Sequence, residues 1–319
     1  MTQTNSPFLS FVVPLYNECQ GVRDFHKALC KVLEAHSIGH EIIYVDDGST
    51  DGTTAIVREI AAEDKSVKVV CLSRNFGKEI ATTAGIHTAK GEAVLTLDSD
   101  GQHPVELIPD FIGKWQEGAK VVVGVRTANR HEGFVKRFGS KLFYGVFSKI
   151  TGFKLVAGSS DFRLIDRSVQ RDFVQMTERN RITRGLIDWL GYKRVYISFV
   201  ANPRLVGDAG YSFRKLLKLA IDSAISLSIS PLYITAYIGA VVLPLSSLLG
   251  LGMIGNYFLG DPLGLHATGG AYLMVLILFL VGILLVSQGI IGLYLSHIHT
   301  ETQNRPLFII DKDQSVGLK

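Results

Sequence analysis

The stretch Ala93-Val94-Leu95-Thr96-Leu97-Asp98-Ser99-Asp100 decides the fold of the first part of this chain. Its first five residues are mostly apolar and predict a buried strand, while Gly101 and Pro104 mark a turn directly after it. Two carboxylates one residue apart therefore stand at the end of a strand. Mg²⁺ and Mn²⁺ prefer such oxygen ligands, and Mg²⁺ usually binds substrate phosphates as well, so the pair indicates a divalent-metal site. Acidic turns after strands are common, so other parts of the sequence have to support this interpretation.

Strand-like and helix-like segments alternate around this stretch. Asp51 is placed to cap one of the helices, because its short side chain can accept from free N–H groups. The alternation predicts an α/β fold with a Rossmann-like, mostly parallel sheet that is covered by helices on both faces. The predicted strands are Phe8–Val13, Glu41–Val45, Val67–Leu72, Ala93–Leu97 and Lys120–Val123, and the predicted helices are Glu18–Ala35, Thr53–Ala62, Lys78–Ala89 and a segment after Pro104.

Polar motifs follow three of these strands, at the sheet edge where ligands bind in such folds. Carboxylates such as Asp46 and Asp47 can accept hydrogen bonds from a nucleotide base and from ribose hydroxyls. An ordinary Asx turn is the alternative interpretation of this pair. Glu18 is open to a second interpretation as a first-turn helix charge that the macrodipole favours. The three motifs are Pro14-Leu15-Tyr16-Asn17-Glu18, Asp46-Asp47-Gly48-Ser49 and Asp98-Ser99-Asp100.

The last third of the chain carries most of its apolar excess. Between Pro231 and His297 there is one acidic residue, Asp261, and no Lys or Arg. The runs Tyr233–Tyr257 and Ala271–Leu295 are each long enough to cross about 30 Å of hydrocarbon as helices. A buried helical hairpin in a soluble core is the alternative, and two charge-free runs of this length disfavour it. We therefore predict two transmembrane helices.

Basic residues flank this region on both sides, while the connecting loop has none, so the positive-inside rule places both termini and the α/β domain in the cytoplasm. The segment Phe213–Leu227 interleaves apolar and charged residues and predicts an amphipathic helix in the headgroup region. No basic and apolar leader of the signal-peptide type opens the sequence. The predicted organisation is an α/β domain over 1–210, an interfacial region over 211–230, a two-helix membrane domain over 231–297 and a cytoplasmic tail over 298–319.

Charge and cysteine content exclude several classes of protein. The formal net charge of +4 suits a protein beside an anionic leaflet, and nothing in it indicates nucleic-acid binding. Cys19, Cys30 and Cys71 show no paired spacing. That pattern suits reduced cytosolic thiols and argues against both a disulfide framework and a zinc site.

Taken together, the motifs resemble a known family. Val13–Glu18, Val45–Thr53 and Leu97–Pro104 look like family 2 glycosyltransferases of the GT-A fold. More specifically, the chain resembles the polyprenyl-phosphate glycosyltransferases. This group includes dolichyl-phosphate mannose synthases and bacterial undecaprenyl-phosphate glucosyltransferases. The more specific resemblance rests additionally on the two apolar runs and on Asn75–Lys78, Ser160–Leu164 and Arg204–Leu217.

The resemblance implies roles for individual residues. It implies a nucleotide pocket lined by Pro14, Tyr16, Glu18 and Asp46, and an Mg²⁺ or Mn²⁺ ion surrounded by Asp98, Asp100 and Gln102. Arginine forks suit phosphate oxygens, which makes Arg126, Arg137 and Arg204 candidates for binding the donor or acceptor phosphates. Asp161 stands where related inverting enzymes carry their base, so the predicted catalytic residues are Asp161, Asp100 and Arg204.

Two other roles for Asp161 remain open at this stage. It could orient the acceptor, because a lipid phosphate with a second pKa near 6 needs little help from a base. It could also pair with Arg163 and only hold a loop.

The expected reaction is the inverting transfer of one hexose to polyprenyl phosphate at the cytoplasmic face of a bacterial inner membrane. UDP-glucose is the preferred donor and GDP-mannose is the alternative. A polysaccharide synthase is disfavoured, because Arg181–Trp189 lacks the Gln-x-x-Arg-Trp signature of that class, and an intact acidic pair with Asp161 argues against a non-catalytic protein. A homo-oligomer is possible, because Gly282, Gly289 and Gly292 on the second span permit close helix contact.

Overall fold

The computed structural model describes residues 9–127, 158–179, 181–200, 255, 258–259 and 269–318. These residues belong to two compact units. One unit contains the sheet with its helices and the segment 305–318, and the other contains helix α10. Several sequence predictions lie outside the described residues, namely those for Arg137, Arg204, the interfacial helix and nearly all of the first apolar run.

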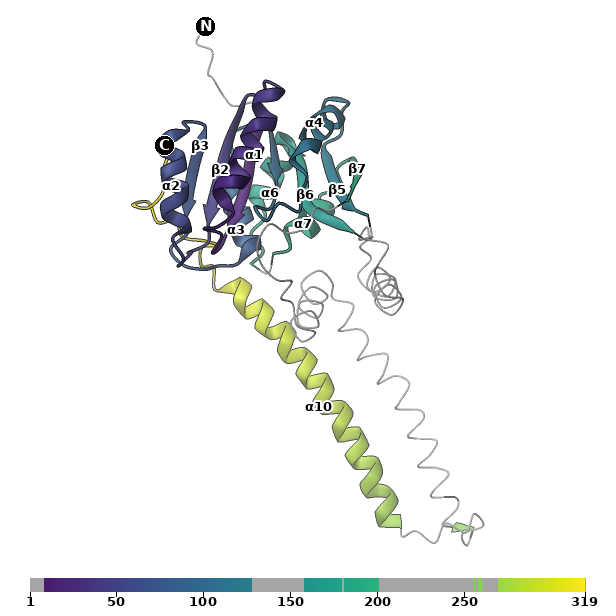
Figure 1. Ribbon diagram of the computed structural model, residues 1–319. Coiled ribbons are helices and arrows are strands. Elements are labelled where there is room, and N and C mark those ends of the chain that lie inside the picture. Colours follow the sequence, from purple (N-terminus) through teal and green to yellow (C-terminus); the bar gives the residue numbers. More distant parts are fainter. Residues whose placement is uncertain are drawn as a thin grey trace. The chain divides into compact units, whose positions relative to one another are not determined.

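A seven-stranded sheet with the order β3-β2-β1-β4-β6-β5-β7 forms the centre of the first unit (Figure 1). Strand β6 runs antiparallel to β4 and β5, and the remaining neighbours are parallel. The prediction of a mostly parallel α/β sheet is therefore confirmed. The strands are β1 (Leu9–Leu15), β2 (His40–Asp46), β3 (Val67–Cys71), β4 (Ala93–Thr96), β5 (Val121–Arg126), β6 (Ser159–Asp166) and β7 (Arg194–Phe199).

Helices cover both faces of the sheet, because its strands are apolar on both sides. Phe11 and Val13 of β1 belong to one hydrophobic cluster, and Val12 between them belongs to the other. The first cluster contains side chains of α1 (Val22–Ala35), α2 (Thr53–Glu63) and α4 (Ile108–Gln116), which follows the short 3-10 turn η1 (Val105–Leu107). The second contains side chains of α3 (Lys78–Thr88), α6 (Arg167–Gln175) and α7 (Thr183–Trp189).

The antiparallel pairing of β4 with β6 brings two distant parts of the chain together. Its register places Ala93 opposite Asp166 and Thr96 opposite Arg163. Continued by two residues, the same register sets Asp98 opposite Asp161. The hydroxyl of Thr96 donates to the main-chain oxygen of Asp161 at 2.6 Å and fixes this end of the ladder.

The C-terminal segment returns to the sheet and covers the edge strand β3. Val69 and Val316 exchange main-chain hydrogen bonds of 3.0 and 2.9 Å, and Asp311 N donates to Cys71 O at 2.8 Å. Phe308 packs its ring edge-on against His87 of α3. The segment 305–318, which the sequence suggested only as part of a tail, thus protects an otherwise unpaired strand edge.

Helix α10 (Gly269–Thr302) contains the whole of the second apolar run, Ala271–Leu295. Among the residues that the structure describes, no helix is recognised as long and apolar enough to cross a membrane. The two-helix membrane domain therefore stays a prediction.

Candidate active site

A pocket of about 310 Å³ lies at the carboxyl ends of β1 and β4. It collects residues from four separate stretches of the sequence, which are the end of β1 with the residues after it, the loops after β2 and β4, and the start of α3 with the residues before it. Five of the predicted site residues line it, namely Pro14, Tyr16, Glu18, Asp98 and Asp100. The structure therefore brings three of the predicted nucleotide-binding residues and the acidic pair into one pocket, whose lining does not include Asp46 or Arg126, and the individual roles stay predictions.

Hydrogen bonds between two loops shape one wall of this pocket. Asn17 adopts a left-handed backbone conformation with φ of 56°, and its side chain accepts from Thr50 N at 2.9 Å. Glu18 N donates to Thr53 Oγ1 at 2.9 Å. These bonds fix the backbone on both sides of the motif, while the side chain of Tyr16 stays 47% exposed and offers a ring face to a ligand.

The carboxylates of Asp46 and Asp47 are both buried and both hydrogen-bonded within the chain. Asp46 accepts from the main chain and hydroxyl of Ser49 and from the hydroxyl of Thr54. Asp47 accepts from the main-chain N–H groups of Phe76 at 2.7 Å and Gly77 at 2.8 Å. Burial raises the pKa of Asp47 even though these two hydrogen bonds oppose the shift. Asp47 lines the pocket, and the nucleotide-binding role of Asp46 stays a prediction.

The turn after β4 arranges the predicted metal ligands. Gly101 has φ of +75°, a conformation that glycine adopts without strain, and Gln102 N donates to Asp100 Oδ1 at 3.0 Å. Asp98 N donates to the Nδ1 atom of His103, whose ring stacks on Phe162 at 5.2 Å. Two carboxylates and one side-chain amide supply only oxygen donors of the kind that hard divalent cations prefer, so these residues fit Mg²⁺ or Mn²⁺.

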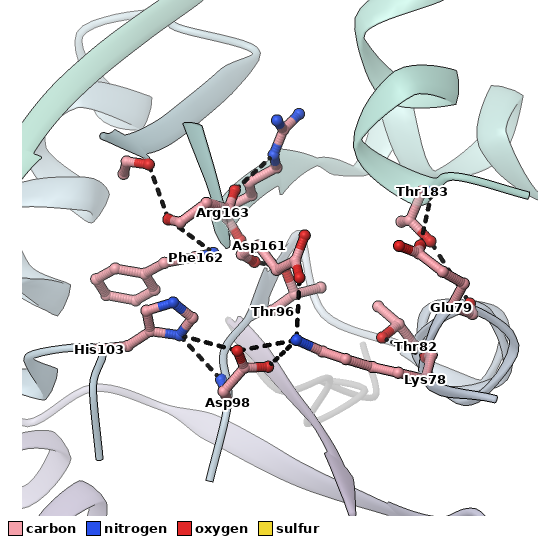
Figure 2. Close-up of polar contacts among 12 residues, drawn as sticks. Lys78, Glu79, Thr82, Thr96, Asp98, His103, Asp161, Phe162, Arg163 and Thr183 are labelled. Carbon is pink, nitrogen blue, oxygen red and sulfur yellow. Dashed lines mark hydrogen bonds and ion pairs between the residues drawn. The ribbon is translucent and has the colours of Figure 1, made fainter. Parts of the chain in front are cut away.

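Lys78, the first residue of α3, joins Asp98 of the acidic pair to Asp161 (Figure 2). Its ammonium lies 2.7 Å from Asp98 Oδ1 and 3.0 Å from Asp161 Oδ2. Half of the Lys78 side chain is exposed, so the cation remains open to the pocket that it lines. The pKa of Lys78 is raised: burial opposes the shift, but the charges of Asp98 and Asp161 outweigh it. A positive charge is therefore already placed between the two carboxylates.

Asp161 itself is held in its ionised form. Burial disfavours the charged carboxylate, but the ammonium of Lys78 outweighs that effect and lowers the pKa of Asp161 below its usual value. A carboxylate with a depressed pKa has little affinity for a proton, which makes it a weak general base. Its Oδ2 atom lies 3.0 Å from the ammonium of Lys78, so the carboxylate is placed to hold that cation.

Arg163 does not pair with Asp161 as the loop-holding alternative required. Its guanidinium is fully buried and donates to Asp188 Oδ1 at 2.9 Å and to Ser159 Oγ at 2.7 Å. The reason is that α7 brings the carboxylate of Asp188 to the buried arginine, whereas Lys78 approaches Asp161 from α3. The alternative in which Asp161 pairs with Arg163 was therefore wrong, because Asp161 pairs with Lys78 and Arg163 pairs with Asp188.

Comparison with known proteins identifies the chain. Residues 10–173 match the family model described as "Glycosyl transferase family 2". The chain belongs to glycosyl transferase family 2. It is 40% identical over 95% of its length to an uncharacterized glycosyltransferase of Synechocystis, covering 94% of that protein. It is also 36% identical over 95% of its length to the bactoprenol glucosyl transferase of Shigella phage SfII, covering 97% of that protein.

A third relative, the prophage bactoprenol glucosyl transferase homolog of Escherichia coli, is 36% identical over 95% of this family 2 chain and is covered to 98%. Among solved structures, mannosyl-3-phosphoglycerate synthase from Rubrobacter xylanophilus is similar with a TM-score of 0.49 and 20% identity, covering 69% of this chain and 72% of that one. The expectation of a glycosyltransferase is thus confirmed at the level of the family.

One residue of the candidate site, Lys78, was not predicted from the sequence of this family 2 enzyme. Lys78 stood in a motif that supported the family resemblance, but nothing in its spacing shows that it reaches Asp98 and Asp161. Strand β6 was not predicted, and only its register against β4 reveals the juxtaposition. Arg126 lies exposed at the carboxyl end of β5, on the same sheet edge, and its phosphate-binding role stays a prediction.

Proposed function

We propose that this enzyme transfers one glucose unit from UDP-glucose to a polyprenyl phosphate with inversion at the anomeric carbon. The observation that carries the proposal is its 36% identity, over 95% of the chain, to proteins described as bactoprenol glucosyl transferases. Bactoprenol is a polyprenyl lipid, so the acceptor follows from these relatives. The pocket of acidic and aromatic residues at the sheet edge supplies a site for the nucleotide sugar.

The donor would bind along the carboxyl ends of β1, β2 and β4. Tyr16, Glu18 and Asp47 line the part of the pocket proposed for the base and ribose. Asp98 and Asp100, with Gln102, would hold an Mg²⁺ or Mn²⁺ ion beside the diphosphate. Such a cation, when bound, stabilises negative charge on the leaving diphosphate.

The acceptor would approach from the side of Asp161. An oxygen of the lipid phosphate attacks the anomeric carbon while the bond from that carbon to the UDP oxygen breaks, and the configuration inverts. At neutral pH the attacking phosphate carries no proton that must be removed. Lys78 and Asp161 therefore orient charge: the ammonium attracts phosphate oxygens, and the carboxylate of Asp161 keeps that ammonium in place.

The connectivity supports an anchor with an even number of membrane crossings. The described part of the catalytic unit includes β7, which ends at Phe199, and the segment 305–318, which is bonded to β3. Both ends of the stretch between Phe199 and Arg305 would therefore lie on the same side of the membrane. Because α10 has no Asp, Glu, Lys or Arg before Glu301, we propose that it is one of two spans, with the catalytic unit and both termini in the cytoplasm.

Donor screening with the purified full-length protein tests the proposal. UDP-glucose and GDP-mannose, each radiolabelled in the sugar, would be supplied with Mg²⁺ and a short-chain polyprenyl phosphate. We expect one glucose in the lipid phase for each UDP released, and little release without the lipid. Preferential transfer of mannose would overturn the donor assignment, and a growing polysaccharide would overturn the single-transfer reaction.

A further inference from the structure

We propose that His26, Cys30 and Asp64 form a second metal site, separate from the acidic pair, that takes a borderline-soft divalent cation such as Zn²⁺. His26 and Cys30 stand one turn apart on the same face of α1, and Asp64 follows the last turn of α2. One donor atom from each residue lies within 4.8 Å of the others. An imidazole, a thiol and a carboxylate are the three ligand types that zinc combines in proteins.

Two of the three donor-atom separations are close to those around one tetrahedral ion, and the third is no longer than 4.8 Å. Nε2 of His26 lies 3.6 Å from Sγ of Cys30 and 3.8 Å from Oδ2 of Asp64. With usual zinc bond lengths, tetrahedral ligand atoms stand about 3.3–3.6 Å apart. Small side-chain rotations would bring the three atoms onto a common ion.

Neighbouring residues hold the ligands in the required orientation. Nδ1 of His26 is paired with the Tyr44 hydroxyl at 3.1 Å, which leaves Nε2 for the ion. Oδ1 of Asp64 accepts from the main chain and hydroxyl of Ser66, each at 2.8 Å, which leaves Oδ2 turned toward His26. Outer-shell bonds of this kind fix the ring and carboxylate orientation in protein metal sites.

Metal binding would have to displace the thiol proton of Cys30 into solvent, because burial and the charge of Asp64 raise the pKa of Cys30 to about 11. The three residues lie beside an open hollow that gives the ion a path from solvent.

The site lies away from the nucleotide pocket. Asp64 precedes β3, whereas Asp98 follows β4, and these strands run in the same direction across the sheet. A bound ion would tie α1 to the turn between α2 and β3. Chelators would remove both this ion and the catalytic one, so loss of activity in EDTA cannot distinguish the two sites.

Cobalt spectroscopy on the full-length protein tests the inference. Co²⁺ would be titrated in the presence of excess Mg²⁺, which occupies sites that contain oxygen ligands only. We expect one equivalent of Co²⁺ to give a thiolate-to-cobalt charge-transfer band and a raised thermal midpoint. The band should persist in the control Cys19→Ser, disappear in Cys30→Ser, and weaken at least tenfold in affinity in Asp64→Asn.

Two results would overturn the site. One is the absence of the band in the folded wild type, which would leave His26 and Asp64 as a simple pair beside a thiol. The other is an unchanged band in Cys30→Ser. Glucosyl transfer is measured separately, so failure of the metal site leaves the proposed reaction standing.

Discussion

Two acidic pairs stand at the carboxyl ends of β2 and β4, two parallel strands with β1 between them, and the chain provides them with different partners. Asp46 and Asp47 accept hydrogen bonds only from neutral groups of the chain, among them Ser49 and Gly77. Asp98 instead faces the ammonium of Lys78 at 2.7 Å. A bound cation can share or replace an ammonium, but it cannot replace a main-chain N–H without opening a loop. We therefore interpret the first pair as part of the loop structure of the site, and the second pair stays the proposed metal-binding pair.

The largest effect should come from removing a carboxylate of the second pair. Asp100→Ala should lower the transfer rate by about 10³-fold or more, because several kcal/mol of charge stabilisation on the leaving diphosphate would be lost. The thermal midpoint should change little, since Asp100 lies in a turn outside the hydrophobic clusters. Rates with and without Mg²⁺ measure this, and full wild-type activity in EDTA would contradict it.

A smaller loss is expected at Asp161. Asp161→Asn keeps the shape of the side chain but releases Lys78 from one of its two carboxylates. The rate at pH 8 should fall less than the 10²–10⁴-fold that removal of a true general base costs, and the loss should be mainly in use of the lipid acceptor. A larger fall in kcat at saturating lipid would restore the base role.

Substitution in the first pair, Asp46 and Asp47, should lower the free energy of unfolding. Asp46→Asn weakens hydrogen bonds from Ser49 and Thr54 to a buried carboxylate, and we expect a loss of about 1.5–3 kcal/mol in the free energy of unfolding. Urea unfolding of the wild type, Asp46→Asn and Asp100→Asn measures the contrast. Equal stability of the two variants would break the distinction between the pairs.

The smallest effect is a difference in pH dependence. The pKa of Asp161 is lowered, so its contribution to stability is present above its unfolded value near 3.8 and is lost as pH falls through the folded value. The pKa of Asp47 is raised, so its contribution to stability has the opposite sign. That contribution decreases as pH rises from the unfolded pKa near 3.8 through the higher pKa of the folded state. Measured between pH 3 and pH 6, the free energy of unfolding should therefore rise more steeply with pH in Asp47→Asn than in the wild type. In Asp161→Asn it should rise less steeply than in the wild type.

The sequence predicted most of the parallel part of this fold. Strands such as Ala93–Thr96 are short and continuously apolar, and the carboxylates after them mark the ligand-binding edge. Asp51 does bind a free N–H at the start of α2, as predicted, although Gly52 occupies the cap position itself. These features depend on neighbouring residues and are therefore visible in a local pattern.

The parts that escaped prediction depend on contacts across long sequence distances. Strand β6 begins with the polar residues Ser159, Ser160 and Asp161, and such a polar run is typical of a loop, so the strand was not predicted. Lys78 meets Asp161 across 83 residues, and Val316 meets Val69 at the far edge of the sheet.

Manganese binding measured by electron paramagnetic resonance tests the contrast between the pairs most directly. Folded wild type, Asp98→Asn and Asp46→Asn would each be titrated with Mn²⁺ at a UDP concentration that saturates each protein, so that a changed affinity for the nucleotide does not alter the result. The account predicts that Asp98→Asn loses the bound-Mn²⁺ signal, while the folded fraction of Asp46→Asn keeps it with an unchanged affinity. Loss of the signal in Asp46→Asn together with its survival in Asp98→Asn would contradict the account.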